Sequence, residues 1–241
     1  PDETIQWLET YGSKIAPYIT DVAQYLLNAV EKGKNIMFEA QLGALRDIDF
    51  GIYPYTSSSQ TLASFAPIGA GIPGVRLDSV IGIMKAYSTC VGEGPFTVEM
   101  FGAEAEKLRA AGGEYGAATG RPRRVGPFDI PASRYGVTVQ GADCIALTKL
   151  DVLSYMDQIP VCTAYEIDGE VTTAFPTGER LNRAKPVITY LEGFGDVSKC
   201  RKREELPQAA KAYIRYIEEK VNSPIRYVSV GAGRDEYIKF D

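Results

Sequence analysis

The sequence of 241 residues contains no histidine, one tryptophan and four cysteines. Histidine is the commonest general acid or base near neutral pH, so acid–base chemistry must rely on other groups or on a segment outside the printed sequence. With no histidine and no C-x-x-C pair, a tight zinc site is not expected, and the cysteine spacing is not that of a disulfide framework. We expect reduced thiols that pack as small hydrophobic side chains at Cys90, Cys144, Cys162 and Cys200.

Long apolar runs and an excess of positive charge are also missing. No run reaches the roughly 18 apolar residues of a membrane span, and no signal peptide opens the chain. The formal net charge is −5 and the isoelectric point about 5.1. This balance argues against a nucleic-acid-binding surface over the whole protein, because phosphate binding draws on clustered Lys and Arg. We therefore expect a cytoplasmic protein that binds neither nucleic acid nor membrane.

The residues that are present are typical of a globular domain with a large core. Hydrophobic residues make up 45% of the chain and charged residues 24%, which are ordinary proportions. A chain of this length can bury most of the surface that its unfolded form exposes. We expect a single α/β domain over residues 1–241.

Helix-type and strand-type patterns alternate along the chain. Apolar spacing typical of helices occurs in 5–30, which Pro17 divides, in 98–111 and in 207–221. Apolar runs typical of buried strands lie at 35–39, 144–147 and 226–230, with a hairpin pattern at 161–165 and 170–173 around Asp168-Gly169. Residues 80–87 fit a helix or a strand, and 43–75 are expected to form an ordered loop region. The alternation predicts a mainly parallel sheet flanked by helices.

Residues 148–151, Thr-Lys-Leu-Asp, follow one of the predicted buried strands. Ligands of open α/β sheets collect at the carboxyl ends of strands. A carboxylate there can accept hydrogen bonds from guanine at N1–H and at the exocyclic amine, a donor pair that adenine lacks. The segment resembles the N-K-x-D box of GTP-binding proteins, with Thr in place of Asn. Taken alone, a K-x-D sequence on a surface turn is more often solvated charge.

Two glycine-containing turns could also approach a ligand. Residues 227–231 form a predicted strand that runs into Gly231, where backbone amides can come close to a base. Residues 116–124 combine glycines, a threonine and three arginines, and a guanidinium binds carboxylate or phosphate through a planar fork. A plain strand end and a solvated basic loop are the alternatives for these two turns.

Residues 38–59 are rich in turns, small residues and hydroxyl groups. Such a composition suits a pocket for a nucleoside monophosphate, where backbone amides and hydroxyls meet the phosphate. The same composition would suit any long ordered loop.

Taken together and in this order, these segments resemble the adenylosuccinate synthetase family. The similarity runs from about Asn35 to Asp241. The segments that carry it are 47–51 with the Tyr-Pro-Tyr at 53–55, then 85–96, 120–124, 148–153 and 206–210. The resemblance implies a P-loop-NTPase-like α/β fold that is incomplete here at its N-terminal side.

The resemblance also implies an activity in purine nucleotide biosynthesis. Members of the family join IMP to L-aspartate: GTP phosphorylates the 6-oxygen of IMP, and the aspartate amine then displaces the phosphate. The transfer needs Mg²⁺ and positioned cations. The expected partners are therefore GTP, IMP and L-aspartate, and full-length members are usually homodimers.

The family's binding residues carry over position by position. The GTP contacts fall on Arg123, Lys149, Leu150, Asp151, Ser229, Val230 and Gly231. The IMP contacts fall on Gln41, Ser57, Val91 and Arg121, and the aspartate contacts on Ala118, Thr119, Arg121 and Arg123. The sequence departs from the family pattern at three of these positions, because Gln41 stands one step early and Ser57 and Ala118 each replace a threonine.

The largest departure is an absence. The family's phosphate loop, catalytic aspartate and catalytic histidine precede the matched region, and this chain has no G-x-x-x-x-G-K loop and no histidine. Without the loop amides, the β- and γ-phosphates have no cradle. No catalytic residue and no metal ligand are therefore assigned, Mg²⁺ is expected to be held mainly by the missing part, and the chain alone is expected to be catalytically silent.

Three interpretations of such a chain stay open. It is a fragment of a working synthetase, a standalone guanine-nucleotide-binding module that has lost catalysis, or a subunit that completes its site with a second polypeptide. Exposed apolar surface where the missing strands belong would favour the first or the third. The purine substrate, IMP or a close analogue such as dGMP, also stays open.

Overall fold

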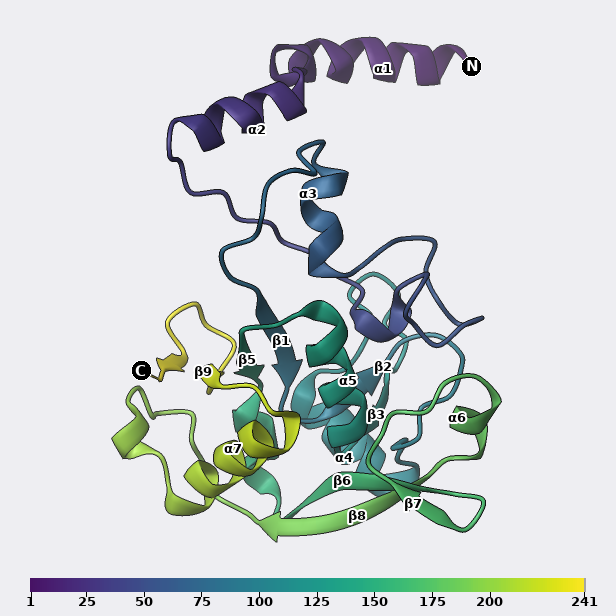
Figure 1. Cartoon of the computed structure of the whole chain (residues 1–241), viewed down its shortest axis with the longest axis vertical. Helices are drawn as coiled ribbons and strands as arrows, with labels where there is room; N and C mark the ends of the chain where they lie inside the picture. Colours follow the sequence, from purple (N-terminus) through teal and green to yellow (C-terminus); the bar gives the residue numbers. More distant parts are fainter. Residues whose placement is uncertain (241) are drawn as a thin grey trace. The chain divides into compact units, whose positions relative to one another are not determined.

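A computed structural model describes residues 1–240, and the chain divides into two compact units. The first unit contains residues 1–40 and 64–77, and the second contains 41–63 and the chain from 78 onward. Figure 1 shows the elements of each unit along the chain. Among the described residues, no helix is long and apolar enough to cross a membrane.

The first unit consists mainly of helices. Its elements are α1 (Asp2–Ile15), the 3-10 turn η1 (Ala16–Tyr18), α2 (Val22–Glu31) and the short α3 (Ala66–Gly69). Pro17 lies in η1, so the predicted division of the first helical segment is confirmed. The Asp21 carboxylate caps α2 by accepting a hydrogen bond from the Gln24 N–H at 3.0 Å. Neither α1 nor α2 contains a buried residue.

The strand predicted at 35–39 is wrong. These residues have no regular structure, and Met37 is 88% exposed. A strand needs a neighbour for its N–H and C=O groups, and no described strand pairs with this segment.

The second unit is built on a sheet with the strand order β1-β5-β9-β10. Its strands are β1 (Ile81–Lys85), β5 (Cys144–Thr148), β9 (Ile225–Ser229) and β10 (Tyr237–Lys239). β1, β5 and β9 are parallel, and β10 is antiparallel to β9. The ambiguous segment at 80–87 is therefore mainly a strand, and the carboxyl ends of three parallel strands meet at one edge (Figure 1).

Two packed helices, α5 (Ile130–Gln140) and α7 (Gln208–Val221), accompany this sheet. The amphipathic pattern predicted for 207–221 is confirmed, because α7 buries Tyr213, Ile217 and Val221 along one face. The Tyr213 hydroxyl also donates to the Ala86 carbonyl at 2.6 Å, which ties α7 to the chain just beyond β1. Sheet and helices share one hydrophobic core.

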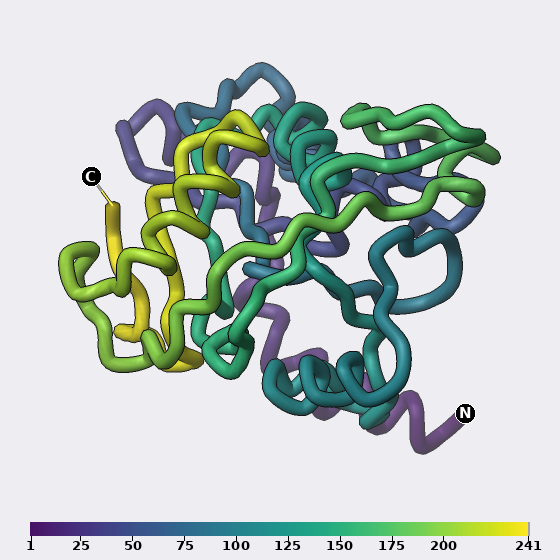
Figure 2. The backbone as a smooth tube through the Cα atoms, turned by 90° about the horizontal axis from the view of Figure 1, so that it is seen from below, coloured from purple at the N-terminus to yellow at the C-terminus, as the bar shows by residue number. Residues whose placement is uncertain are grey.

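A second sheet joins β4 (Phe128–Asp129), β6 (Gln158–Ile167), β7 (Glu170–Thr172) and β8 (Lys185–Glu192). Figure 2 shows β6 and β8 running side by side in green. The predicted hairpin is confirmed, because Asp168 and Gly169 join β6 and β7 with φ values of 56° and 87°. Only β4 and β6 are parallel here, so the sheets of this α/β fold are mixed.

The remaining elements are short. They are β2 (Ser88–Cys90) paired with β3 (Arg124–Gly126), α4 (Gly102–Gly112), α6 (Glu179–Arg183), and the 3-10 turns η2 (Ala44–Arg46), η3 (Ala63–Phe65), η4 (Leu150–Tyr155) and η5 (Arg203–Glu205). All four cysteines are free thiols, as the sequence predicts, and Cys144 and Cys162 are buried.

Candidate functional site

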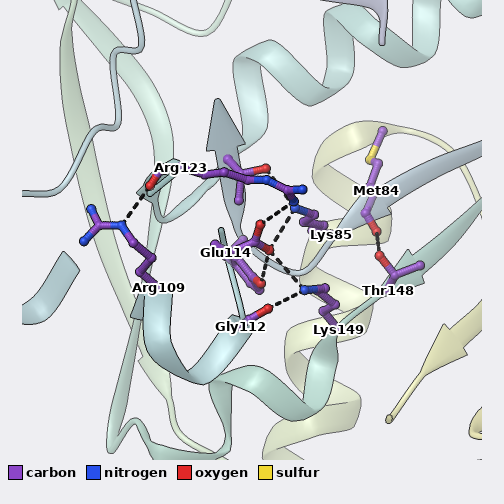
Figure 3. A network of polar contacts seen from close by, with 10 residues as sticks. Met84, Lys85, Arg109, Gly112, Glu114, Arg123, Thr148 and Lys149 are labelled. Carbon is purple, nitrogen blue, oxygen red and sulfur yellow. Dashed lines mark hydrogen bonds and ion pairs between the residues drawn. The ribbon is translucent and has the colours of Figure 1, made fainter. Parts of the chain in front are cut away.

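The candidate site lies where β1, β5 and β9 end. Lys85 is the last residue of β1 and pairs with Thr148, the last residue of β5. The Thr148 hydroxyl donates to the Met84 carbonyl at 3.0 Å, which fixes the two strand ends together (Figure 3). Parallel strands thus bring residues that are distant in sequence to one edge, the usual ligand position of an open α/β sheet.

The turn after β5 is joined to the end of β9. Lys149 adopts a left-handed backbone conformation with φ 60°, which a non-glycine residue adopts at some cost in energy. Its N–H donates to the Ser229 hydroxyl at 2.9 Å, so the first predicted motif meets the second. Leu150 follows as a fully buried anchor.

Asp151 carries a buried acceptor that has no partner. Its Oδ1 atom is inaccessible and receives no hydrogen bond from the described residues. Burial raises the pKa of this carboxyl above its ordinary value. A buried acceptor without a donor is costly, so this oxygen is suited to a ligand that brings its own N–H groups.

The glycine turn after β9 is closed by Glu236. The Val230 N–H donates to the Glu236 carbonyl at 2.9 Å, and the Gly233 N–H donates to Glu236 Oε2 at 2.6 Å. A Cβ atom on Gly231 would lie 2.4 Å from the same Oε2, so the Glu236 side chain would have to shift to admit a larger residue there. The Glu236 charge also contributes to the raised pKa of Asp151.

Beneath these turns lies a carboxylate that the sequence patterns do not single out. Glu114 is fully buried and receives four hydrogen bonds (Figure 3). Its Oε1 accepts from Lys85 Nζ at 2.9 Å, Tyr87 Oη at 2.6 Å and Lys149 Nζ at 3.1 Å, and its Oε2 accepts from Arg123 at 2.9 Å. One carboxylate therefore holds three cations from three separate segments of the chain.

The charge state of Glu114 follows from these donors. Burial by itself would raise the pKa of Glu114, but the hydrogen bonds from Lys85, Tyr87 and Lys149 outweigh it and lower the pKa to about 2. For Lys85 burial prevails, and its pKa lies below the ordinary lysine value although Glu114 favours the charged form. Burial and the neighbouring carboxylate both raise the pKa of Tyr87, which therefore stays a donor.

The arginine-containing loop is a hairpin that starts at Glu114. The Arg123 N–H donates to the Glu114 carbonyl at 2.9 Å, and the Gly116 N–H donates to the Arg121 carbonyl at 2.8 Å. The Thr119 hydroxyl accepts from the Arg121 N–H at 3.3 Å. This arrangement places Ala118, Thr119 and the Arg121 side chain on the exposed tip of the hairpin.

The three arginines of the loop have different surroundings. Arg121 is exposed, whereas Arg123 reaches the buried Glu114 and keeps a buried Nε without a partner. Arg124 donates to the carbonyls of Gly92 and Gly94 at 3.3 and 2.8 Å. Arg124 therefore stabilises the loop at residues 92–94. Only the guanidinium groups of Arg121 and Arg123 remain candidates for ligand contact.

Arg46 links Ser57 to Val91. The Ser57 N–H and hydroxyl both donate to the Arg46 carbonyl, at 2.8 and 2.9 Å. The Arg46 guanidinium donates to the Val91 carbonyl at 2.8 Å and to the Glu93 carbonyl at 3.1 Å. Two segments predicted to bind IMP are thus tied together by a residue that no sequence pattern indicates.

The neighbouring Asp47 orders the loop that follows it, whereas Gln41 lies outside that loop. Burial alone would raise the pKa of Asp47, but hydrogen bonds from the backbone N–H groups of Thr61, Phe50 and Asp49 lower it. Gln41 is exposed, and the structure gives its side chain no hydrogen-bond partner among the described residues. Its contact with IMP stays a prediction.

The described residues do not form a metal centre. No group of three His, Cys, Asp or Glu side chains among residues 1–240 is placed to hold a metal ion. The best-buried carboxylate of the site, Glu114, has both oxygens bonded to cationic side chains, which makes it a poor ligand for another cation.

This chain is similar in sequence to adenylosuccinate synthetases along almost its whole length. A family model described as adenylosuccinate synthetase matches residues 1–238, so the similarity extends to the N-terminal helices. The adenylosuccinate synthetase of Synechococcus sp. strain WH7803 is 45% identical over 98% of this chain, and that of Cutibacterium acnes is 43% identical over 99%. The matches cover 55% and 56% of those proteins, so the chain spans about half the length of the curated relatives it matches.

Two solved structures are also similar. A fully ligated adenylosuccinate synthetase from Plasmodium falciparum superposes with a TM-score of 0.94 at 36% identity, covering 100% of this chain and 58% of its own. A succinoaminodeoxyadenylate synthetase of cyanophage S-2L, bound to dGMP and dATP, gives a TM-score of 0.55 at 16% identity over 90% of this chain and 49% of its own. The second likeness concerns the fold alone.

Proposed function

The chain belongs to the adenylosuccinate synthetase family, and from this premise we propose that it forms the guanine-, IMP- and aspartate-binding part of a GTP-dependent ligase. That ligase joins IMP to L-aspartate in purine nucleotide biosynthesis. The assignment of ligands to particular residues is part of the proposal and rests on the edge where β1, β5 and β9 end.

The unpaired Asp151 oxygen is the observation that carries the guanine assignment. Guanine offers N1–H and an exocyclic amine to an acceptor such as the buried Oδ1 of Asp151. Adenine offers no such pair, so it would leave this oxygen unsatisfied. Ser229, Val230 and Gly231 line the same pocket in this proposal, because the Lys149 N–H bonds the Ser229 hydroxyl.

The other two ligands are assigned to the flanking loops. IMP meets Ser57 and Val91, which Arg46 holds together, and aspartate meets Thr119 and Arg121 on the exposed hairpin tip. Arg123 lies between the hairpin and the strand ends, and its part-exposed guanidinium is suited to a carboxylate or a phosphate. Gln41 and Ala118 belong to these sets by resemblance alone.

We propose that the chain by itself is catalytically silent. It contains neither a glycine-rich phosphate loop nor a histidine. The outer edge of β1 has no partner among the described strands, and Ile81 and Ile83 are 47% and 69% exposed there. An unpaired apolar edge is what an incomplete sheet presents, since self-sufficient domains cover or charge such edges. This supports a chain that works together with further protein, and it argues against a standalone module.

Magnesium is the cofactor that this reaction class implies. The described carboxylates do not fit a Mg²⁺ site, as Glu114 is committed to cations and no group of three His, Cys, Asp or Glu side chains among residues 1–240 is placed to hold a metal ion. We therefore assign the metal to the parts of the family's enzymes that this chain does not span.

Calorimetric titration of the chain with GDP and ADP tests the guanine assignment. We expect a preference for GDP of about tenfold or more, and Asp151→Asn should abolish it because an amide replaces one acceptor by a donor. Asp168→Asn, in the exposed β6–β7 turn, is the matched control and should keep the preference. Equal affinities of the unmodified chain for GDP and ADP would contradict the guanine assignment.

A phosphate-release assay tests the silence of the chain. With GTP, IMP, Mg²⁺ and L-aspartate present, we expect no release above the rate without protein, because the β- and γ-phosphates lack their loop amides. Release that depends on both IMP and the chain would contradict this proposal while leaving the guanine assignment intact.

A further inference from the structure

We propose that Glu114 is a positioning residue that couples the guanine side of the site to the arginine hairpin by holding Lys149 and Arg123 on one buried carboxylate. The inference rests on the proposed function and deepens it. It concerns a residue that contacts no assigned ligand and acts only through its neighbours.

The two oxygens of Glu114 serve different sides of the site. Oε1 holds Lys149 at 3.1 Å, and Lys149 begins the turn that carries Asp151. Oε2 holds Arg123 at 2.9 Å, at the base of the hairpin whose tip carries Arg121. Because Glu114 has no exposed surface, a ligand cannot reach it without first displacing these cations.

The cations stay part-exposed, 33% for the Arg123 side chain and 35% for Lys149, so a ligand can reach them. Arg123 bonds Glu114 through one terminal nitrogen, while its Nε is buried without a partner. Lys149 is fixed a second time through the Gly112 carbonyl at 2.5 Å. A guanidinium and an ammonium that are held before ligand arrives lose less side-chain entropy on binding.

The backbone around Glu114 is anchored on both sides. Gly113 caps the C-terminal end of α4 with φ 60°, and the Glu114 N–H then donates to the Arg109 carbonyl at 2.9 Å. The Arg109 guanidinium in turn donates to the Arg123 carbonyl at 2.9 Å (Figure 3). Glu114 and Arg123 are therefore fixed as a pair, and the carboxylate has little freedom to follow one cation away from the other.

Charge and position predict opposite effects of removing this carboxylate. Glu114→Gln removes the one negative charge that faces three cations, so the net charge of the site becomes more positive by one. If Glu114 mattered only for the local charge, the variant would bind a nucleotide diphosphate more tightly. If Glu114 positions Lys149 and Arg123, the variant binds GDP more weakly despite the gained charge, because one amide cannot accept from all the cations.

Calorimetry with GDP, ADP and inorganic pyrophosphate distinguishes these outcomes. We expect Glu114→Gln to lower GDP affinity by about tenfold and to reduce the preference for GDP over ADP. Glu170→Gln, in β7, makes the same chemical change at an exposed carboxylate outside the site and should leave all three affinities within about twofold. Unchanged or tighter GDP binding by Glu114→Gln overturns the proposal.

Amine labelling followed by mass spectrometry gives a readout that needs no ligand. We expect Lys149 to be acylated about threefold faster or more in Glu114→Gln than in the unmodified chain, as labelling follows the fraction of released side chain. Glu114→Asp, which keeps the charge but shortens the reach, should show the same direction and serves if the glutamine variant does not fold. An unchanged labelling rate in both variants overturns the positioning role.

The two readouts separate this inference from the proposed function. If the unmodified chain does not prefer GDP to ADP, the guanine assignment fails. Lys149 labelling and pyrophosphate affinity then still decide whether Glu114 positions the cations. If the preference is present and Glu114→Gln leaves it intact, the assignment stands and the positioning role fails.

Discussion

Glu114 and Asp129 are both buried carboxylates of the second unit, yet their surroundings have little in common. Glu114 lies under the strand ends of the first sheet, with three cations within 3.1 Å. Asp129 is the last residue of β4 in the second sheet and the N-cap of α5, and it is 5% exposed. Its oxygens accept from the Tyr165 hydroxyl at 2.7 and 2.6 Å and from the Ala132 N–H at 3.2 Å. None of the cationic side chains among residues 1–240 bonds it.

The pKa values of the two carboxyls are shifted in opposite directions. Burial raises the pKa of Asp129 to about 6, because the phenol and one N–H compensate only part of the lost hydration. At Glu114 the cations outweigh burial and the pKa falls to about 2. Burial alone therefore does not identify a functional carboxylate, and the number of cations around it is the more informative property.

The two carboxylates also differ in what they connect. Asp129 caps α5 and joins it to β6 through Tyr165. Glu114 joins residues that begin or end loops at an open edge of the sheet. The first arrangement stabilises a fold, and the second holds cationic side chains that remain part-exposed at the sheet edge.

The largest expected effect comes from removing the acceptor under the cations. Glu114→Leu should lower the free energy of unfolding by about 3–5 kcal/mol at neutral pH, since it leaves three part-buried cations without their shared counter-charge. Urea denaturation measures this directly. A loss below about 1 kcal/mol would show that the cations reach water freely and would remove the contrast with Asp129.

The second effect is the pH dependence of stability that the buried Asp129 produces. The folded-state pKa is raised from 3.8 to about 6, so the stabilising contribution is complete below pH 3.8 and lost as the pH rises through 6. At about 1.4 kcal/mol per pKa unit the loss amounts to about 3 kcal/mol. Asp129→Asn should remove this dependence, measured as the difference between unmodified and variant stability across that range. A difference that does not vary with pH would refute the raised pKa.

Much of the scaffold on which this contrast rests could be predicted from local patterns. Pro17, the Asp168-Gly169 turn and the apolar face of α7 each follow from a residue's own geometry or from helical spacing. β8 was not predicted, because most of its side chains are exposed and the part-buried ones do not alternate along the strand. α5 was missed because Gly136 interrupts a pattern that already lacks a clear apolar stripe.

The candidate site divides in the same way. Lys149, Ser229 and Gly231 could be predicted as site residues because they lie at or just after the ends of buried strands, and parallel strands end at one edge of the sheet. Glu114 could not, since its partners Lys85 and Lys149 lie 29 and 35 residues away and only the fold brings them together. Arg46 was missed for the same reason, because its bonds to Val91 span 45 residues.

The third effect is the loss of the stability contribution of Glu114 at low pH. The folded-state pKa of Glu114 is lowered from 4.5 to about 2, so its contribution is present above pH 4.5 and lost as the pH falls toward 2. Because the cations are partly exposed, we expect about 2 kcal/mol. Glu114→Gln should remove this loss, seen as a difference from the unmodified chain that shrinks with acidification. Glu170→Gln, on the exposed β7 strand, should leave this acid dependence unchanged, which separates the buried carboxylate from a surface one.

The smallest effect compares the two tyrosines that donate to these carboxylates. Tyr87→Phe removes one of four donors from Glu114, which keeps its three cations, so we expect a loss of about 1 kcal/mol. Tyr165→Phe leaves Asp129 with only the Ala132 N–H, and we expect a loss of about 2 kcal/mol together with a further rise of the Asp129 pKa. Urea denaturation at neutral pH measures both variants side by side. If Tyr87→Phe proves as damaging as Tyr165→Phe, the phenol and not the cations holds Glu114 in place, and the two carboxylates would then depend on their surroundings in the same way.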